Sequence, residues 1–282
     1  EIPDSENAMR IYDNLTEKLS SPEFQPRELY KKMNIEVLCT TDAASDSLKT
    51  HQEIKKSGWD GKIIPTFRPD AVTNIRGENF RQEIEKLSAA ADIDIHDFES
   101  YIRALEKRRA FFKEMGAVST DQAVITPYTH ELPQSETDRI FKAALNGNVS
   151  DSDATAFEGH MLIEMARMSC NDQLVMQLHP GVLRNHNRII YDKFGPDKGC
   201  DIPIQTEFTK NLHSMLNQYG NNSNFTLCLF TVDENTYSRE LAPLAGHYPS
   251  VRLGPPWWFN DSWNGMTRFF DSVTETAGLY NL

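Results

Sequence analysis

Hydrophobic positions along the chain alternate between short runs rich in β-branched residues and longer stretches with helical spacing. The short runs predict six strands, at 35–40, 62–67, 117–125, 173–178, 224–232 and 250–253. The longer stretches predict helices at 26–33, 45–56, 97–115, 135–145, 153–168, 238–244 and 264–279. A strand followed by a helix, repeated along the chain, is typical of βα units on a parallel sheet.

This pattern fits two α/β architectures. An open, doubly wound sheet usually carries a glycine-rich phosphate turn, and neither GxGxxG nor GxxxxGK[ST] occurs in the sequence. A (β/α)8 barrel, a TIM barrel with about six of its eight βα units present, fits as well. We expect a single partial barrel domain over 1–282, with a helical insertion at 126–170 between strands.

Composition narrows the class of protein. The chain has 282 residues with 29 Lys and Arg against 41 Asp and Glu, a net charge of −12. Because phosphate contacts need a basic face, nucleic acid is excluded as a partner. No apolar run approaches the roughly 18 to 20 residues of a membrane helix, so a membrane partner is not expected either.

The four cysteines, Cys39, Cys170, Cys200 and Cys228, are widely spaced without a CxxC pair. This spacing excludes a zinc finger and favours a reducing, cytoplasmic setting. The chain begins with Glu1 instead of Met, so we expect that the gene product starts earlier.

Polar or aromatic residues of chemically useful types follow each predicted strand. In a barrel the chemistry lies where the strands end, so these positions are the candidate site. They are Asp42 after the first strand, Arg68 and Asp70 after the second, Asp121 and Gln122 within the third, His179 and Arg184 after the fourth, Asp233 and Glu234 after the fifth, and Trp257 and Trp258 after the sixth.

Each candidate also has a purely structural interpretation. Asp42 could cap the helix that starts near Ser45, since Asp is a favoured N-cap residue. Arg68 could pair with Asp70, although an arginine at a barrel mouth is also a natural clamp for a carboxylate.

Residues at the later strand ends could likewise have either a structural or a functional role. His179 could be a satisfied core residue, a catalytic group or a metal ligand, and Arg184 nearby favours a functional role. Asp233 could be surface charge. Trp257 and Trp258 could belong to the core, but tandem tryptophans after two prolines more often form the wall of a sugar pocket.

Four separated motifs, in order, resemble those of the uronate (glucuronate) isomerases of the amidohydrolase superfamily, and the similarity covers nearly all of the chain. The motifs are Thr40-Thr41-Asp42, Thr66-Phe67-Arg68-Pro69-Asp70, Gln177-Leu178-His179-Pro180-Gly181-Val182-Leu183-Arg184-Asn185, and Trp257-Trp258-Phe259-Asn260-Asp261 followed by Gly265-Met266.

The resemblance implies a barrel of amidohydrolase type and a metal-assisted aldose to ketose isomerisation in carbohydrate catabolism. The substrate is a uronic acid: D-glucuronate gives D-fructuronate, or D-galacturonate gives D-tagaturonate. The family holds zinc or manganese with a His-x-His pair after its first strand and an aspartate after its eighth. The first histidine here is His51, and no His-x-His pair occurs. We therefore expect a chain truncated at both ends, without certain metal ligands, that alone could be inactive.

The resemblance assigns roles to matching positions. It implies that Arg68 contacts the substrate, that His179 and Arg184 act beside the reacting carbons, and that Trp257, with Trp258 beside it, lines the sugar pocket. It also implies a homo-oligomer as a possible assembly.

Other positions and other functions stay open. Asp42, Asp121 and Asp233 are further candidates, although Gln122 after Asp121 departs from the family pattern, in which a histidine often follows. One alternative function is a non-catalytic partial barrel that binds an anionic sugar or has no activity. The other is a metal-dependent hydrolase of the same superfamily, which is less favoured because 230–234 offers carboxylates where such hydrolases usually keep a histidine.

Overall fold

The computed structural model describes residues 2–282, which form two compact units. The smaller unit comprises the chain up to Thr40 together with Leu48–Pro65, and the larger unit comprises Thr41–Ser47 and Thr66–Leu282.

The smaller unit contains the helices α1 (Ala8–Ser20), α2 (Pro26–Lys32) and α3 (Lys49–Lys56). Tyr30 of α2 organises it: its hydroxyl donates to the carbonyl of Glu36 at 2.8 Å and accepts from the N–H of Lys62 at 3.1 Å. The Tyr30 ring packs edge-on against Trp59, with centroids 5.0 Å apart. These contacts fix the two segments that lead into the first strands.

A parallel sheet is the centre of the larger unit. Only the carboxyl-terminal residues of its first two strands belong to this unit. The strands are β1 (Leu38–Ala43), β2 (Ile63–Arg68), β3 (Ser119–Val124), β4 (Val175–Pro180), β7 (Leu227–Leu229) and β8 (Val251–Leu253). Their order in the 6-stranded sheet is β1-β2-β3-β4-β7-β8, and the pairs from β2 to β8 are parallel.

This order decides between the two architectures that the sequence left open. A doubly wound sheet reverses its strand order at a switch point, whereas the strands here follow the chain in one direction. Winding in one direction is the pattern of a (β/α)8 barrel, of which six strands are present. The predicted fold class is confirmed.

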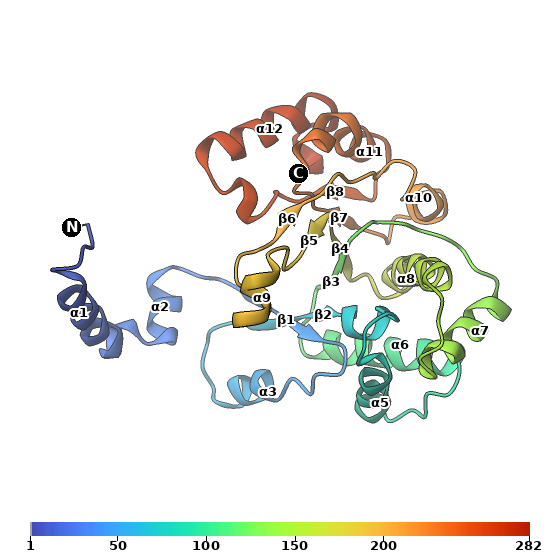
Figure 1. Ribbon diagram of the computed structural model, residues 1–282, viewed down its shortest axis with the longest axis horizontal. Helices are drawn as coiled ribbons and strands as arrows, with labels where there is room; N and C mark the ends of the chain where they lie inside the picture. Colours follow the sequence, from blue (N-terminus) through green and yellow to red (C-terminus); the bar gives the residue numbers. More distant parts are fainter. Residues whose placement is uncertain (1) are drawn as a thin grey trace. The chain divides into compact units, whose positions relative to one another are not determined.

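Helices surround the sheet of the larger unit. Figure 1 shows one group beside β3 and β4 and a second group beside β7 and β8. The first group is α4 (Asp70–Thr73), α5 (Phe80–Ala91), α6 (Phe98–Glu114), α7 (Gln134–Leu145) and α8 (Asp151–Asp172); the second is α10 (His213–Tyr219), α11 (Ala242–His247) and α12 (Trp263–Ala277). An excursion after β4 carries a hairpin, β5 (Val182–Leu183) with β6 (Ile202–Pro203), and α9 (Arg188–Phe194).

Aromatic and methionine side chains fill the space between α6, α7 and α8. Tyr101 of α6 stacks on Phe141 of α7 with centroids 4.8 Å apart, and Phe141 in turn stacks on Phe157 of α8 at 6.2 Å. Met161 and Met165 continue the buried stripe of α8, so these methionines are core residues.

Several element boundaries differ from the prediction. The first strand starts at Leu38 instead of Ile35, because the N–H of Ile35 still bonds to the carbonyl of Tyr30 in the turn that ends α2. The helix predicted from Ser45 starts only at Lys49, after Leu48 adopts a left-handed conformation with φ 53°. The helices α1, α4, α5, α9 and α10 and the β5–β6 hairpin were not predicted.

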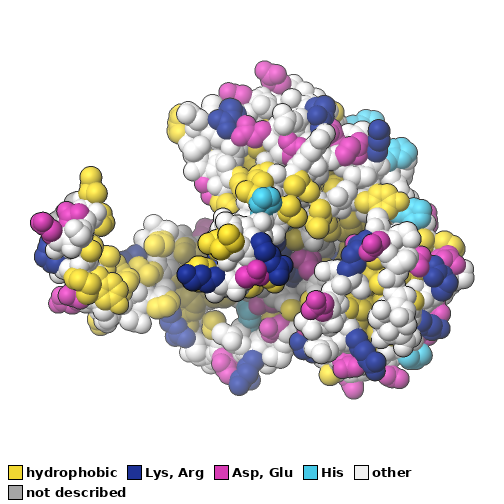
Figure 2. All heavy atoms as spheres, in the orientation of Figure 1, with side chains coloured by type: hydrophobic (Ala, Val, Ile, Leu, Met, Phe, Trp, Pro, Cys, Tyr) yellow, Lys and Arg dark blue, Asp and Glu magenta, His cyan; other side chains and the backbone are white. Residues whose placement is uncertain are grey.

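The distribution of charged side chains on the surface agrees with the expectation that the protein has no basic face. On the face shown in Figure 2, Lys and Arg side chains are interspersed with Asp and Glu and do not gather into one basic patch. Among the helices of residues 2–282, none combines the length and the apolar character that crossing a membrane requires.

Candidate active site

The alternation of side chains along the strands separates two faces at the carboxyl ends of β2, β3 and β4. Phe67, Met176 and Leu178 are fully buried on the face toward the helices, and Phe67 contacts the ring of Phe112 in α6 at 5.1 Å. Side chains one position further along point to the opposite face. That face carries the predicted site residues.

Arg68, Asp121 and His179 meet on this second face, although they come from three different strands. Asp121 Oδ1 lies 2.7 Å from His179 Nδ1, an ion pair when the imidazole is protonated. Arg68 Nη2 lies 3.7 Å from Asp121 Oδ2, and Arg68 Nε donates to Asp70 Oδ2 at 2.8 Å. The strand order thus brings a cation, a carboxylate and a titratable ring together.

The carboxylates of Asp121 and Asp70 have pKa values shifted in opposite directions. Burial alone would raise the pKa of Asp121, but His179, followed by Arg68 and Arg184, outweighs burial and brings that pKa below its ordinary value. For Asp70, burial prevails over the opposing effect of Arg68 and raises the pKa to about 6. Asp121 is therefore the ionised partner of His179 at neutral pH.

Aromatic rings support His179 from two sides. Its imidazole stacks on Phe230 with centroids 4.1 Å apart and an interplanar angle of 14°, and Trp257 meets it edge-on at 4.9 Å. Trp258 lies 5.5 Å from Trp257 and is 53% exposed. Trp257 therefore belongs to the surroundings of His179, whereas Trp258 lies at their outer edge.

Arg184 lies on the excursion that follows β4. Its Nη1 donates to Asp201 Oδ2 at 2.9 Å, and Asp201 Oδ1 accepts from the N–H of Asn185 at 3.0 Å. Arg184 and His179 line the same cavity, and the charge of Arg184 contributes to the lowered pKa of Asp121. The structure thus brings Arg184 near the cluster, held by its own carboxylate.

The two remaining aspartate candidates come from other parts of the chain, Asp42 from β1 and Asp233 from the loop after β7. Asp42 is a half-buried residue within β1, and the N-cap residue of α3 is Leu48, so the capping interpretation of Asp42 is wrong. Asp233 is buried, and its oxygens accept hydrogen bonds from the N–H groups of Thr206 and Asn235. Its carboxylate links two loops.

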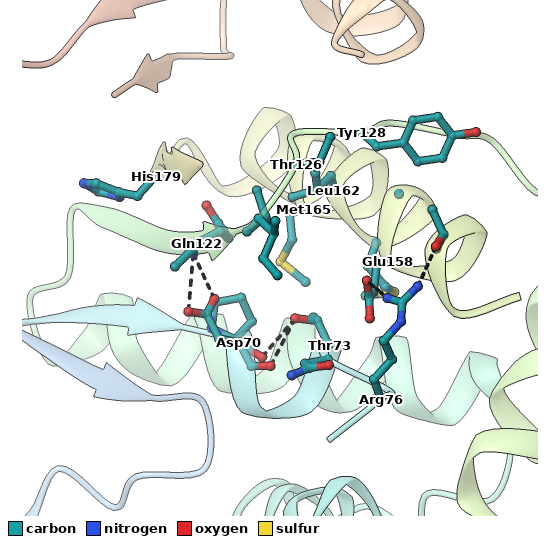
Figure 3. A pocket seen from close by; sticks show the side chains of 18 of the residues that line it. Asp70, Thr73, Arg76, Gln122, Thr126, Tyr128, Glu158, Leu162, Met165 and His179 are labelled. Carbon is teal, nitrogen blue, oxygen red and sulfur yellow. Dashed lines mark hydrogen bonds and ion pairs between the residues drawn. The ribbon is translucent and has the colours of Figure 1, made fainter. Parts of the chain in front are cut away.

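A cavity of about 820 Å³ opens beside these strand ends, between α4, the loop after β3 and α8. Figure 3 shows Asp70 and Gln122 at one side and Glu158, paired with Arg76, at the other. In that view His179 extends away from the apolar wall formed by Leu162 and Met165 of α8. The cavity therefore adjoins the cluster and continues toward the helix layer.

The described residues do not fit the divalent metal that the family resemblance implies. Within 2–282 no three His, Cys, Asp or Glu side chains form a group able to hold a metal ion. Asp121 and His179 could supply two donor groups, but they face each other at 2.7 Å.

The sequence did not reveal two partners and one contact in this site. Phe230 under His179 looked like part of a strand, and Asp201 opposite Arg184 lies in a segment for which no element was predicted. The contact between Asp121 and His179 depends on strand register, which a single sequence does not give.

A sheet wound in one direction, with an arginine and a carboxylate–histidine pair at its carboxyl end, defines an α/β-barrel protein with an enzyme-like site at its strand ends. The sequence model of the glucuronate isomerase family matches residues 1–281. The chain belongs to this family.

Individual relatives agree with this assignment. A uronate isomerase of Nostoc punctiforme is 53% identical over 281 residues, covering 100% of this chain and 59% of the relative. One of Brucella canis is 49% identical over 276 residues, covering 98% of this chain and 59% of the relative. The chain therefore spans about 59% of the length of these relatives.

Solved structures show the same fold. A glucuronate isomerase from Caulobacter crescentus superimposes with a TM-score of 0.96 at 44% identity, covering 100% of this chain and 59% of that one. A uronate isomerase from Thermotoga maritima gives a TM-score of 0.92 at 28% identity, covering 100% and 62%. The recognition made from the motifs is confirmed.

Proposed function

We propose that the protein is an aldose–ketose isomerase that interconverts D-glucuronate and D-fructuronate, or D-galacturonate and D-tagaturonate. The observation that carries the proposal is the meeting of Arg68 with the Asp121–His179 pair at the strand ends of a chain from the glucuronate isomerase family.

The reaction requires a proton to move between neighbouring carbons. Removal of the proton from C2 of the aldose gives an enediolate, and its return at C1 gives the ketose, while the hydroxyl proton passes from O2 to O1. An imidazole paired with a carboxylate suits such proton transfers near neutral pH. His179, oriented by Asp121 and held on Phe230, is the residue that we propose for this role.

Two arginines supply the positive charge that the anions need. Arg68 binds the uronate carboxylate through its guanidinium, and Arg184 stabilises the developing charge on the enediolate oxygens. The net charge of −12 repels an anionic sugar at long range, so both arginines act locally. Trp257, edge-on to His179, offers a flat apolar face to the sugar ring.

The proposal also includes a metal cofactor, an oligomeric state and a cellular location. Zinc or manganese is the metal that the resemblance implies, and elemental analysis of the purified protein tests for it directly. A homo-oligomer is the proposed assembly, and the cytoplasm the proposed location.

The test is an assay of the protein expressed from its full reading frame with D-glucuronate and D-galacturonate as separate substrates. We expect a ketose product, and His179→Asn should lower kcat by roughly 10²- to 10⁴-fold, the usual contribution of a general acid–base group. His213→Asn is the matched control, because His213 on α10 contacts only the exposed Asn217 among the partners described for it.

Other outcomes identify the other functions. Binding of uronate without turnover would indicate a non-catalytic sugar-binding protein, and hydrolysis of an amide or ester would indicate a hydrolase. The family match and the relatives do not favour either alternative. If His179→Asn keeps full activity, His179 is not the proton-transfer residue.

A further inference from the structure

Asp70 stands between the substrate-binding arginine and the neighbouring strand. It is the first residue of α4, directly after β2. Its Oδ2 accepts the hydrogen bond from Arg68 Nε at 2.8 Å, and its two oxygens accept from the N–H of Ala123 on β3 at 3.2 and 3.3 Å. A single carboxylate thus connects the guanidinium at the end of β2 to the backbone of β3.

The segment that carries Asp70 is fixed from the helix side. The hydroxyl of Tyr101, a fully buried residue of α6, donates to the carbonyl of Val72 at 2.9 Å. The side chain of Val72 is 1% exposed. Since α4 is a single short turn with both of these anchors, Asp70 cannot shift without breaking a buried contact.

The contact with Asp70 determines which part of the guanidinium remains available. Arginine offers five N–H donors in a rigid planar fork, and Asp70 takes the one on Nε. The Nη end then lies toward Asp121, with Nη2 3.7 Å from Asp121 Oδ2. A carboxylate binds an arginine best through two parallel hydrogen bonds, so the direction of the Nη end matters.

We propose that Asp70 is a positioning residue that holds the Nε side of Arg68 against β3 and thereby aims the Nη end of the guanidinium at the uronate carboxylate. This inference rests on the proposed function. Because Asp70 acts through Arg68 in this proposal, its loss should weaken substrate binding and leave the chemical step largely unchanged.

The experiment compares Asp70→Ala and Asp70→Asn in the protein expressed from its full reading frame. Asp70→Ala should raise KM for D-glucuronate about tenfold with kcat within about threefold, since interactions shared by ground and transition state appear in KM. Asp70→Asn should restore KM to near the wild-type value, because its amide oxygen can accept from Arg68 Nε and Ala123 N–H. Asp153→Ala is the matched control, since it breaks the pair with Arg139 on the exposed surface.

A double-mutant cycle shows whether Asp70 acts through Arg68. On an Arg68→Met background, Asp70→Ala should cause no further rise in KM, because the group that it orients is gone. A further rise of similar size, or a loss of kcat at constant KM in the single variant, would overturn the proposal. Failure of Asp70→Asn to restore KM would also overturn it, since charge or general stability would then explain the effect.

A readout without turnover separates this inference from the proposed function. In ¹⁵N NMR spectra of the substrate-free protein, the Arg68 Nε–H resonance should exchange slowly with water and should lose this protection in Asp70→Ala. The resonance of Arg184, held by Asp201, should not change. If wild type shows no isomerase activity but this pattern is found, the proposed function fails and the positioning contact stands; if the Arg68 resonance is unaffected by Asp70→Ala, the positioning contact fails whatever the activity.

Discussion

At the scale of single residues, the candidate positions were accessible to sequence reasoning because parallel strands end at a common edge. Arg68, Asp121 and His179 each follow or end an apolar run, and the structure brings them into contact. Their pairing was not accessible, because it depends on register between strands that lie more than fifty residues apart in the chain. The contact between Phe230 and His179 could not be predicted from the sequence for the same reason.

Arg184 allows a sharp test at this scale. Its side chain is 42% exposed and paired with Asp201, so replacing it with methionine removes a charge without opening a cavity in the core. Arg184→Met should abolish most of the isomerase activity and should leave the melting transition cooperative and within a few degrees of wild type. Activity assays and thermal denaturation of the same preparation check both expectations.

The control for Arg184→Met comes from the same excursion. Arg188 on α9 pairs with Asp192 at 2.8 Å and is 80% exposed, so Arg188→Met makes the same chemical change away from the cluster. It should retain activity. A loss of cooperative melting in Arg184→Met would instead assign Arg184 a structural role.

At the scale of elements, length alone did not decide which helices could be predicted, since the seven-residue α2 was expected at 26–33 whereas α1 and α5, of 13 and 12 residues, were not expected. The helix predicted at 97–115 is α6, and that at 135–145 is α7, within one residue at each end. The short α9 and α10, of seven residues each, have too few turns to show a period. The two-residue strands β5 and β6 lie below what alternation can reveal.

The start of α6 carries a capping box whose contribution can be measured. Asp97 Oδ1 accepts from the N–H of Ser100 at 2.8 Å, and Ser100 Oγ accepts from the N–H of Asp97 at 3.1 Å. Asp97→Ala should lower the free energy of unfolding by ~1 kcal/mol, the usual cost of losing an N-cap side chain. Urea denaturation at neutral pH measures the change.

Asp94→Ala is the matched control for the capping box, because the Asp94 side chain is 94% exposed just before the helix. It should change the unfolding free energy by less than about 0.5 kcal/mol, as ordinary surface substitutions do. Equal effects of the two substitutions would show that Asp97 does not stabilise α6 by capping.

At the scale of the whole molecule, buried titratable groups couple folding to pH in opposite directions. Burial raises the pKa of Asp70 to about 6, so its contribution to stability is present at low pH and is lost as the pH rises through 6. His160 on α8 behaves oppositely: burial lowers its pKa to about 4, and its Nδ1 accepts from the N–H of Leu132 at 3.2 Å. The pH profile of the molecule is the sum of such groups.

His160 gives the clearest pH prediction. Its ordinary pKa is 6.5 and its pKa in the fold is about 4, so its stabilising contribution is complete above pH 6.5 and declines as the pH falls toward 4. His160→Asn keeps an acceptor for Leu132 but cannot titrate. Between pH 7.5 and 5, the wild type should therefore lose about 2 kcal/mol of unfolding free energy relative to His160→Asn, at 1.36 kcal/mol per pKa unit.

Urea denaturation of both proteins at several pH values measures this difference, with His213→Asn as the control, since that histidine contacts the exposed Asn217. Taking the difference between two proteins removes Asp70 and every other group that titrates equally in both. If the unfolding free energies of wild type and His160→Asn change in parallel from pH 7.5 to 5, the pKa of His160 is the same in the folded and unfolded chains. Convergence of the two curves toward low pH would instead identify the burial of His160 between α6 and α8 as one cause of acid destabilisation.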